Sequence, residues 1–341
     1  ETAIKTPFTD PASVVIFPHT YVRRASSSSA ATSGAWSCPA GSEALVLSLA
    51  GVAAQQVSGI PPNDNYSPGF SNIEGPVWID GALYVSHISG GTAPPPSRIL
   101  RWVPGGTAEV FIASAGTNGL AVDGNGALLG ASHALGGVVR FNLASPSDAP
   151  VVIAGDYMGQ RFNSPNDIAV GGGGSIYFSD PDWQAPSPRP QAEERVYRIP
   201  PVGPLEALGE YSTGGGAQRV AKPNGVLLSL DGNTLYVGGT GGLFRFPVMS
   251  GGAVGIGSPV TAISGGTDGL TKDCAGNIYV THGQGVTVLN AQETLVGQIA
   301  VGASVTNVAF GGADRTTLFI TSMGSTPRVY QAALNVPGFP F

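Results

Sequence analysis

Short runs of alternating apolar and polar residues recur along this chain with one common layout. A polar residue opens an apolar-rich run, a tight turn follows, and a second apolar-rich run ends in another polar residue. The clearest copy covers residues 268–282, with its turn (DCAGN) at residues 273–277. Alternation on both sides of a turn rich in Asp, Asn and Gly predicts a β-hairpin.

This hairpin unit occurs six times. Its opening residues, which follow one another at intervals of 44, 48, 58, 44 and 39 residues, are Glu74, Asn118, Asn166, Asn224, Asp268 and Asn307. Repeats of about 40–50 residues made of short strands are typical of β-propeller blades. Two further apolar-rich runs fit between successive hairpins. The sequence therefore predicts an all-β fold, a six-bladed β-propeller with four-stranded blades.

The N-terminal part of the chain has a different composition. Residues 25–34 (ASSSSAATSG) form a Ser-rich, low-complexity stretch of the kind found in flexible segments. We therefore divide the chain into an N-terminal arm, residues 1–42, and the propeller, residues 43–341. The last repeat supplies only three strands. We expect an N-terminal strand at residues 43–50 to pair with them and close the ring, because a bare edge would otherwise remain.

Composition supports the all-β prediction and narrows the choice of partners. Only 11% of the residues are charged, against about 25% in an average soluble protein. Gly (51 residues) and Pro (28 residues) are abundant, which favours tight turns over helices. The net charge is −6 and no basic patch is present, so nucleic acids and anionic membranes are poor partners. A small molecule remains as the expected partner.

The two cysteines, Cys38 and Cys274, lack the spacing of a metal site. They are either two independent thiols or one disulfide that ties the arm to the fifth blade. A disulfide would imply an oxidising compartment. The chain also begins at Glu1 rather than Met, as it would after removal of a signal peptide. We therefore expect an exported protein, periplasmic or extracellular.

The first strand of every propeller blade lines the central channel, so the six opening residues should meet on the axis. Two carboxylates and four amides would then offer oxygen atoms to a hard divalent cation, Ca²⁺ first and Mg²⁺ second. The ring has no His, which argues against a zinc triad. A structural role is the alternative, because Asn and Asp often begin strands by forming turns. Six in register favour a metal site, since two buried carboxylates repel each other without a cation.

The second strand of each hairpin runs back, so its last residue returns to the face where the opening residue lies. We call this face the mouth, and these last residues are His87, His133, Asp180, Thr240, His282 and Ser322. Two long loops, residues 88–97 and 181–194, start there and should form the rim. We predict substrate contacts for His282, for Asp180 and for Trp183 in the second loop. Asp180 could instead only cap its turn.

Several strings of residues resemble one known family. They are IEGPVW at residues 73–78, NSPNDIAV at 163–170, KPNGVLLSLDGNTLYV at 222–237 and DGLTKDCAGNIYV at 268–280. Between residues 70 and 335 the chain resembles the SMP-30/gluconolactonase family of calcium-dependent, six-bladed propeller hydrolases. The resemblance is greatest to the bacterial gluconolactonase-like branch of that family.

This resemblance implies metal ligands at Glu74, Asn166, Asn224 and Asp268, and a role for Asp268 as catalytic base or nucleophile. It also implies that Asn118 and His133 face the substrate. The departures from the family pattern are Ala127, Ala131 and Ser132 in the second repeat and Gly238, Gly239 and Thr240 in the fourth. They leave the metal site intact and point to a pocket that is wider or more apolar than a sugar lactone requires.

The sequence leaves three functions open. The first is a metal-dependent lactonase, in which a cation polarises the ring carbonyl and Asp268 activates water or attacks directly. The second is a phosphotriesterase-like hydrolase that uses the same site. The third is a propeller that binds a ligand and catalyses nothing. A panel of lactones beside a panel of organophosphates would separate the three.

Overall fold

The computed structural model describes residues 37–67 and 69–339, and the predicted N-terminal arm, residues 1–42, lies mostly outside them. The described residues are almost entirely strands and turns, as the sequence predicts. Their helices are two 3₁₀ turns, η1 (Ser42–Ala44) and η2 (Ser250–Gly252). No helix in this part of the chain is long and apolar enough to cross a bilayer.

Four separate sheets each contain four antiparallel strands in sequence order. The second hairpin unit gives β6 (Thr117–Val122), β7 (Leu128–Ser132), β8 (Gly137–Phe141) and β9 (Val151–Ala154). The third gives β12 (Ile168–Val170), β13 (Ile176–Asp180), β14 (Arg195–Ile199) and β15 (Glu206–Leu208). The fourth gives β18 (Val226–Leu228), β19 (Thr234–Gly239), β20 (Gly242–Pro247) and β21 (Ser258–Ser264). The fifth gives β22 (Thr267–Lys272), β23 (Ile278–His282), β24 (Gly285–Leu289) and β25 (Leu295–Ala300).

The first and last hairpin units share one eight-stranded sheet. One half is β2 (Ser71–Ile79), β3 (Ala82–Ser89), β4 (Ser97–Trp102) and β5 (Glu109–Ile112). The other half is β26 (Val305–Gly311), β27 (Thr317–Gly324), β28 (Val329–Ala333) and β1 (Gln55–Gln56). The halves join where Ser71 and Asn72 of β2 pair with Gly324 and Met323 of β27. The predicted division into six blades therefore differs from the sheet pattern at this junction.

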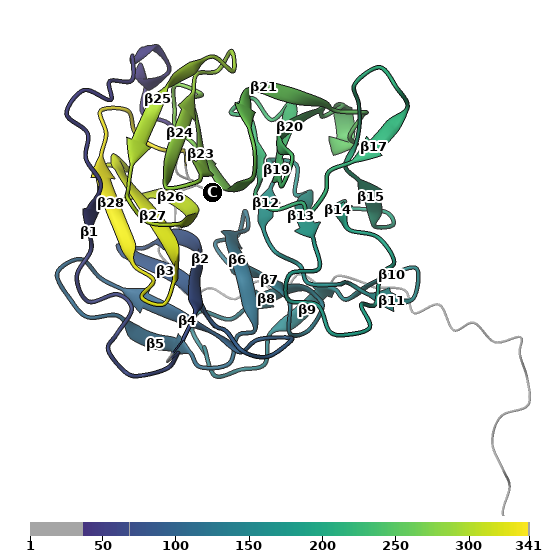
Figure 1. Ribbon diagram of the computed structural model, residues 1–341, viewed down its shortest axis with the longest axis horizontal. Helices are drawn as coiled ribbons and strands as arrows, with labels where there is room; N and C mark the ends of the chain where they lie inside the picture. Colours follow the sequence, from purple (N-terminus) through teal and green to yellow (C-terminus); the bar gives the residue numbers. More distant parts are fainter. Residues whose placement is uncertain (1–36, 68, 340–341) are drawn as a thin grey trace, which may run out of the picture. The chain divides into compact units, whose positions relative to one another are not determined.

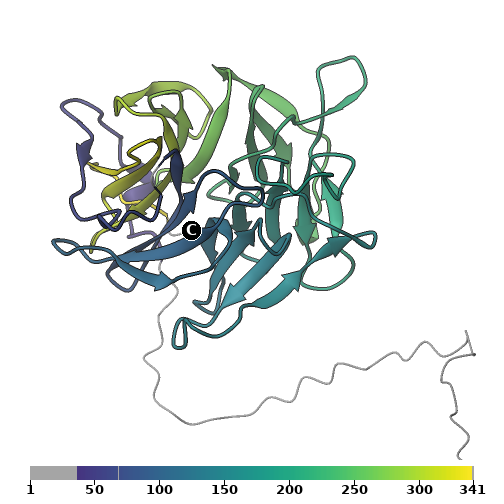
Figure 2. The ribbon, with the colours of Figure 1, turned by 60° about the horizontal axis from the view of Figure 1, so that its bottom comes forward.

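The sheets follow one another around a common centre, which makes the fold propeller-like (Figure 1). The purple and yellow ends of the described chain lie side by side in both views (Figure 1, Figure 2), where β2 pairs with β27 and β1 with β28. Two additional hairpins lie outside the main sheets. They are β10 (Asp156–Tyr157) with β11 (Gln160–Arg161), and β16 (Glu210–Ser212) with β17 (Ala217–Arg219).

The N-terminal side does close the last blade, but not at the predicted segment. Gln55 and Gln56 of β1 pair with Gln331 and Tyr330 of β28. The prediction of a strand at residues 43–50 was wrong, because β1 already occupies the outer edge of β28. Val46 in that segment is 83% exposed, and hydrogen bonds to the Asn335 side chain hold the segment instead of a ladder.

Apolar layers between neighbouring sheets fix the inner strands in place. Trp78 of β2 stacks on Phe319 of β27, with ring centroids 5.4 Å apart. Val77 of β2 and Leu120 of β6 lie in one buried cluster that spans the first two hairpin units. Because such interiors are close-packed, each inner strand is held at a defined distance from the axis.

In four hairpin units, the inner strand has a β-bulge at the opening residue. The strand register shifts between Glu74 and Val77, between Thr117 and Leu120, between Thr267 and Leu270, and between Val305 and Val308. Bulges of this kind redirect side chains next to functional sites. The glycine after the opening residue permits close approach of the next unit. A Cβ on Gly75 would lie 2.6 Å from the carbonyl oxygen of Asn118, and one on Gly225 would lie 2.2 Å from that of Asp268.

The disulfide between Cys38 and Cys274 is present, with Cα atoms 5.5 Å apart. Cys274 is fully buried in the turn between β22 and β23, and its N–H donates to the carbonyl of Pro337. Gly338 pairs with Asp273 in the same turn. One turn of the fifth blade therefore holds segments from both ends of the described chain.

Candidate functional site

Each of the six hairpin units carries a polar residue at the start of its inner strand. Glu74, Asn118, Asn166 and Asn307 are buried, whereas Asn224 and Asp268 keep some exposure. Each is carried by an inner strand or by the residues just before one. The Asn224 amide donates a hydrogen bond to the carboxylate of Asp268, and the charge of Asp268 acts on Glu74. The structure thus brings together carboxylates and amides that lie far apart in the sequence.

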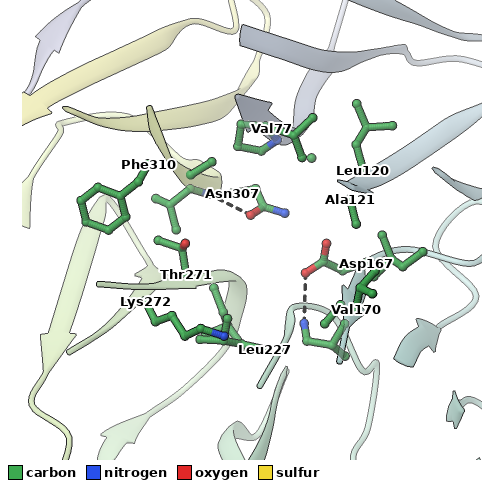
Figure 3. Close-up of a pocket in the computed structure, with 18 of the residues that line it drawn as sticks. Val77, Leu120, Ala121, Asp167, Val170, Leu227, Thr271, Lys272, Asn307 and Phe310 are labelled. Carbon is green, nitrogen blue, oxygen red and sulfur yellow. Dashed lines mark hydrogen bonds between the residues drawn. The ribbon is translucent and has the colours of Figure 1, made fainter. Parts of the chain in front are cut away.

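Asp167 is a site residue that the sequence analysis missed. It occupies the position after Asn166, where four of the other five units have Gly. One carboxylate oxygen accepts the N–H of Val226 at 3.0 Å, and the side chain also accepts a hydrogen bond from Asn307. Asp167 and Asn307 point toward the same space in the channel (Figure 3). The break in the Gly pattern was the signal that could have revealed it.

The sequence predicts that all six opening residues direct an oxygen atom toward the axis, and the structure differs from this prediction at Asn307. The carbonyl oxygen of the Asn307 side chain accepts the N–H of Val308 at 2.8 Å. Its amide nitrogen therefore faces Asp167, and Asn307 serves as a donor to a carboxylate rather than as an oxygen ligand. The four residues implied as ligands do not include Asn307, so that set is unaffected.

Three carboxylates share this buried region, and each resists ionisation. Burial raises the pKa of Glu74 well above its usual value, and the charges of Asp268 and Asp167 raise it further. Burial raises the pKa of Asp268 well above its usual value, and the charge of Asp167 raises it further. Burial raises the pKa of Asp167 to about 6, against the opposing effect of its hydrogen bonds. A nearby positive charge would relieve this repulsion.

The donor set fits a hard divalent cation. Both polar atoms of the Asn118 side chain are buried without a hydrogen-bond partner, and an unsatisfied buried polar group costs about 1–3 kcal/mol. Carboxylate and amide oxygens are the ligands that Ca²⁺ prefers. Within residues 37–67 and 69–339, no three His, Cys, Asp or Glu side chains form a metal site by themselves. A cation here would therefore need the amide oxygens as well as the carboxylates.

Two of the residues predicted to contact the substrate, His133 and Asp180, are buried and hydrogen-bonded to the protein itself, although the Nδ1 atom of His133 has no partner. The Nε2 atom of His133 lies 2.9 Å from the carbonyl oxygen of Pro95, and burial lowers its pKa to about 4, so the ring is neutral at pH 7. The carboxylate of Asp180 accepts the N–H groups of Asn163 at 2.9 Å and Ser164 at 2.7 Å. Burial raises the pKa of Asp180 to about 7. Asp180 thereby holds the segment that leads to Asn166.

Two further residues predicted to contact the substrate, His282 and Trp183, remain accessible. His282 ends β23 and is partly buried, and Trp183 is 52% exposed. The ammonium of Lys222 lies 5.0 Å from the centroid of the Trp183 ring. Lys222 precedes Asn224 by two residues, so this contact places the loop 181–194 beside the axial site. The loop 88–97 reaches the same end through the contact of its Pro95 with His133.

A cavity of about 60 Å³ lies in the channel (Figure 3). Asp167, Asn307, Thr271 and Lys272 supply polar groups to its wall, and apolar residues of the inner strands supply the rest. Lys272 is only 6% exposed. Its ammonium donates to the carbonyl of Leu228 at 2.6 Å and lies 4.7 Å from the Phe339 ring. Burial lowers its pKa to about 8.

Replacing Lys272 by Met should stabilise the protein at neutral pH. A lysine in the unfolded chain keeps its proton up to about pH 10.5, whereas folded Lys272 loses it near pH 8. The unfolded state binds more protons in this window, so the wild-type free energy of unfolding should rise with pH, by up to about 3 kcal/mol. Lys272→Met should remove that rise and add about 1–3 kcal/mol at pH 7. Urea unfolding from pH 7 to 10 measures both.

The control for this prediction is Arg140→Met, which removes a cation whose side chain is 43% exposed. It should leave the pH dependence of the wild type in place. If Lys272→Met is less stable than the wild type across the whole range, then the buried ammonium stabilises the fold and the prediction is wrong.

Comparisons with known proteins agree with the resemblance seen in the sequence. The model of the SMP-30/gluconolactonase/LRE-like region matches residues 73–324, which is more than half of the chain. A gluconolactonase from Zymomonas mobilis is 23% identical over 291 residues, which cover 75% of this chain and 77% of that protein.

Two solved structures are also similar. A gluconolactonase from Xanthomonas campestris has a TM-score of 0.65 and 29% identity, over 79% of this chain and 88% of its own. A calcium-binding regucalcin from Agrobacterium tumefaciens has a TM-score of 0.60 and 19% identity, over 80% and 95% of the two chains. The second likeness supports the fold alone.

Proposed function

Because the chain belongs to the SMP-30/gluconolactonase/LRE-like family, we propose that it is a lactonase-type hydrolase that opens a lactone at the axis of the propeller. The observation that carries this proposal is the convergence of Glu74, Asp167 and Asp268 beside the unpartnered amide of Asn118. A buried group of carboxylates with raised pKa values next to an open polar position is a usual property of an active site. The named gluconolactonase relatives support the same reaction class.

The finer features of the proposal follow from the sheet pattern and the donor set. We count the two halves of the eight-stranded sheet as separate blades, which gives six. Glu74, Asn166, Asn224 and Asp268 would hold one divalent cation, with Ca²⁺ favoured by the all-oxygen donors. The bound cation would supply Lewis-acid polarisation of the lactone carbonyl.

We assign proton transfer in this reaction to Asp268. Its carboxylate takes a proton from the attacking water while the water oxygen forms a bond to the carbonyl carbon. The bond between that carbon and the ring oxygen then breaks, and the departing ring oxygen takes the proton back. The product is a hydroxy acid. The hydrogen bond from Asn224 fixes the orientation of the Asp268 carboxylate during these steps.

The surrounding residues orient this machinery. Asp180 holds the segment before Asn166 through two backbone N–H groups. The neutral imidazole of His133 fixes the loop that carries Pro95. Asn118, His282 and the unpartnered Nδ1 atom of His133 remain as groups that can hydrogen-bond the lactone. We propose that the protein is exported, since a disulfide such as Cys38–Cys274 persists in oxidising compartments.

Removal and return of the cation test this proposal. Chelator-treated protein should hydrolyse no lactone, and Ca²⁺ should restore turnover. Binding at a concentration of one hundred times Kd stabilises a folded protein by about 2.7 kcal/mol, so the Tm should rise by about 5 °C. Elemental analysis without stoichiometric metal, together with an unchanged Tm, would exclude the cation.

The same experiment distinguishes the other two functions. Organophosphate turnover that exceeds turnover of every lactone would favour the phosphotriesterase-like reaction. Cation binding without hydrolysis of any lactone, ester or organophosphate would favour a propeller that only binds a ligand.

A further inference from the structure

We propose that Glu194, the last residue of the loop 181–194, is a positioning residue that places Asn224 for cation binding and catalysis by holding the segment before it. This inference rests on the proposed function, in which Asn224 binds the cation and orients Asp268. Three observations carry it: the contacts of the Glu194 carboxylate, the backbone conformation of Lys222, and the hydrogen bonds of Asn224.

The carboxylate of Glu194 directs both of its oxygens at one residue of the next hairpin unit. Its Oε2 atom accepts the backbone N–H of Lys222 at 2.8 Å, and its Oε1 atom lies 2.9 Å from the ammonium of the same lysine. The Glu194 side chain is only 16% exposed, and β14 begins at the following residue, Arg195. Charge-assisted hydrogen bonds from a group next to a strand are strong and well positioned. Glu194 is therefore a fixed anchor for Lys222.

Lys222 needs an anchor because its backbone lies in the left-handed region. Its φ angle is 48°, which residues with a side chain rarely adopt, and a proline follows it. Strain of this kind persists only where surrounding contacts impose it, and it is common at ligand sites. The ammonium of Lys222 is also paired with Asp182, and the guanidinium of Arg189 lies 3.1 Å from Asp182 and 3.8 Å from Glu194. The loop 181–194 thus holds both the backbone and the side chain of Lys222.

The strained residue leads directly into the proposed site. Only Pro223 separates Lys222 from Asn224, whose backbone N–H donates to the carbonyl of Gly238 at 2.8 Å. The side-chain amide of Asn224 donates to the carboxylate of Asp268. A rotation of the Lys222 backbone out of its left-handed conformation would therefore displace the amide that orients Asp268.

Amide hydrogen exchange tests the holding contact on the purified full chain without a cation. In Glu194→Ala, exchange at the N–H groups of Lys222 and Asn224 should become about tenfold faster, because a hydrogen bond to a charged group is lost. The matched control is Glu193→Ala, since the neighbouring carboxylate pairs with Arg195 and Arg219 instead of Lys222. Its exchange at the same two groups should equal that of the wild type. Unchanged exchange in Glu194→Ala would overturn the inference.

Calorimetric titration with Ca²⁺ measures the consequence for the site. Glu194→Ala should raise the Kd for Ca²⁺ by about 10–100-fold, the usual effect of losing a group that orients a ligand. At saturating Ca²⁺, kcat for δ-valerolactone should still be about tenfold lower while KM changes little, because Asn224 orients Asp268 rather than the lactone. Glu194→Gln keeps an oxygen for the N–H of Lys222, so its Kd and kcat should lie between those of Glu194→Ala and the wild type.

The outcomes separate this inference from the proposed function. A Glu194→Ala variant that unfolds at lower urea concentration but keeps the wild-type Kd and kcat would show that Glu194 only stabilises the loop. Wild-type protein that binds no Ca²⁺, or that opens no lactone, would instead contradict the proposed function. In that case the exchange rates of Glu194→Ala and Glu193→Ala would still decide whether Glu194 holds the segment before Asn224.

Discussion

Asp268→Asn should lower kcat/KM for lactone hydrolysis by about 10²–10⁴-fold, the usual contribution of one general acid–base group. The carboxylate of Asp268 sits in the buried axial cluster and receives a hydrogen bond from Asn224. An amide in its place keeps the size of the side chain but cannot take a proton from water. The variant should stay folded, because removal of one of three repelling carboxylates relieves repulsion rather than adding it.

Two measurements make this prediction specific. Circular dichroism and urea unfolding should show that Asp268→Asn retains its fold, and initial rates should show the loss of turnover. Asp231→Asn is the matched control, since Asp231 is exposed in the turn between β18 and β19 and should change kcat/KM little. Turnover of Asp268→Asn near the wild-type value would refute the role assigned to Asp268.

The repeat pattern predicts most of the fold because it reports the burial of alternate residues directly. Every predicted hairpin appears in the structure, and so do the outer strands that follow them. The closing strand was placed wrongly, at residues 43–50 rather than at Gln55–Gln56. The alternation of apolar residues in a segment does not show whether a strand edge is free to pair with it. Here β1 already occupies the edge of β28.

In the candidate site, too, the sequence pattern does not reveal which distant residues a side chain contacts. The six opening residues could be placed on the axis, since strand order fixes where the backbone lies. The direction of each polar group depends on partners far away in the sequence. His133 bonds to Pro95, 38 residues earlier, and Asn307 turns its amide toward Asp167. Asp167 was missed because only the first polar residue of each unit was considered.

The disulfide supports the second large prediction. Cys38→Ala should lower the free energy of unfolding by about 2–5 kcal/mol, because the lost cross-link joins residues 236 positions apart and so restricts a very long loop of the unfolded chain. The folded state should also open more easily near the N-terminal segment. Only two residues of β1 pair with β28, and the segment before β1 includes the exposed Val46. Cleavage by a protease near residues 45–50 should therefore become faster.

Cys38 is the better residue to change, because it is partly exposed, whereas Cys274 is fully buried in a turn that also holds Pro337. Replacement of Cys38 removes the cross-link and leaves that packing in place. Wild-type protein treated with a reductant should behave like Cys38→Ala and serves as an independent control. Thiol titration of the unfolded, unreduced wild type should find no free thiol. A Cys38→Ala variant as stable as the wild type would show that the bridge does not hold the N-terminal segment. Two free thiols would show that no bridge forms and would remove the main support for an exported protein.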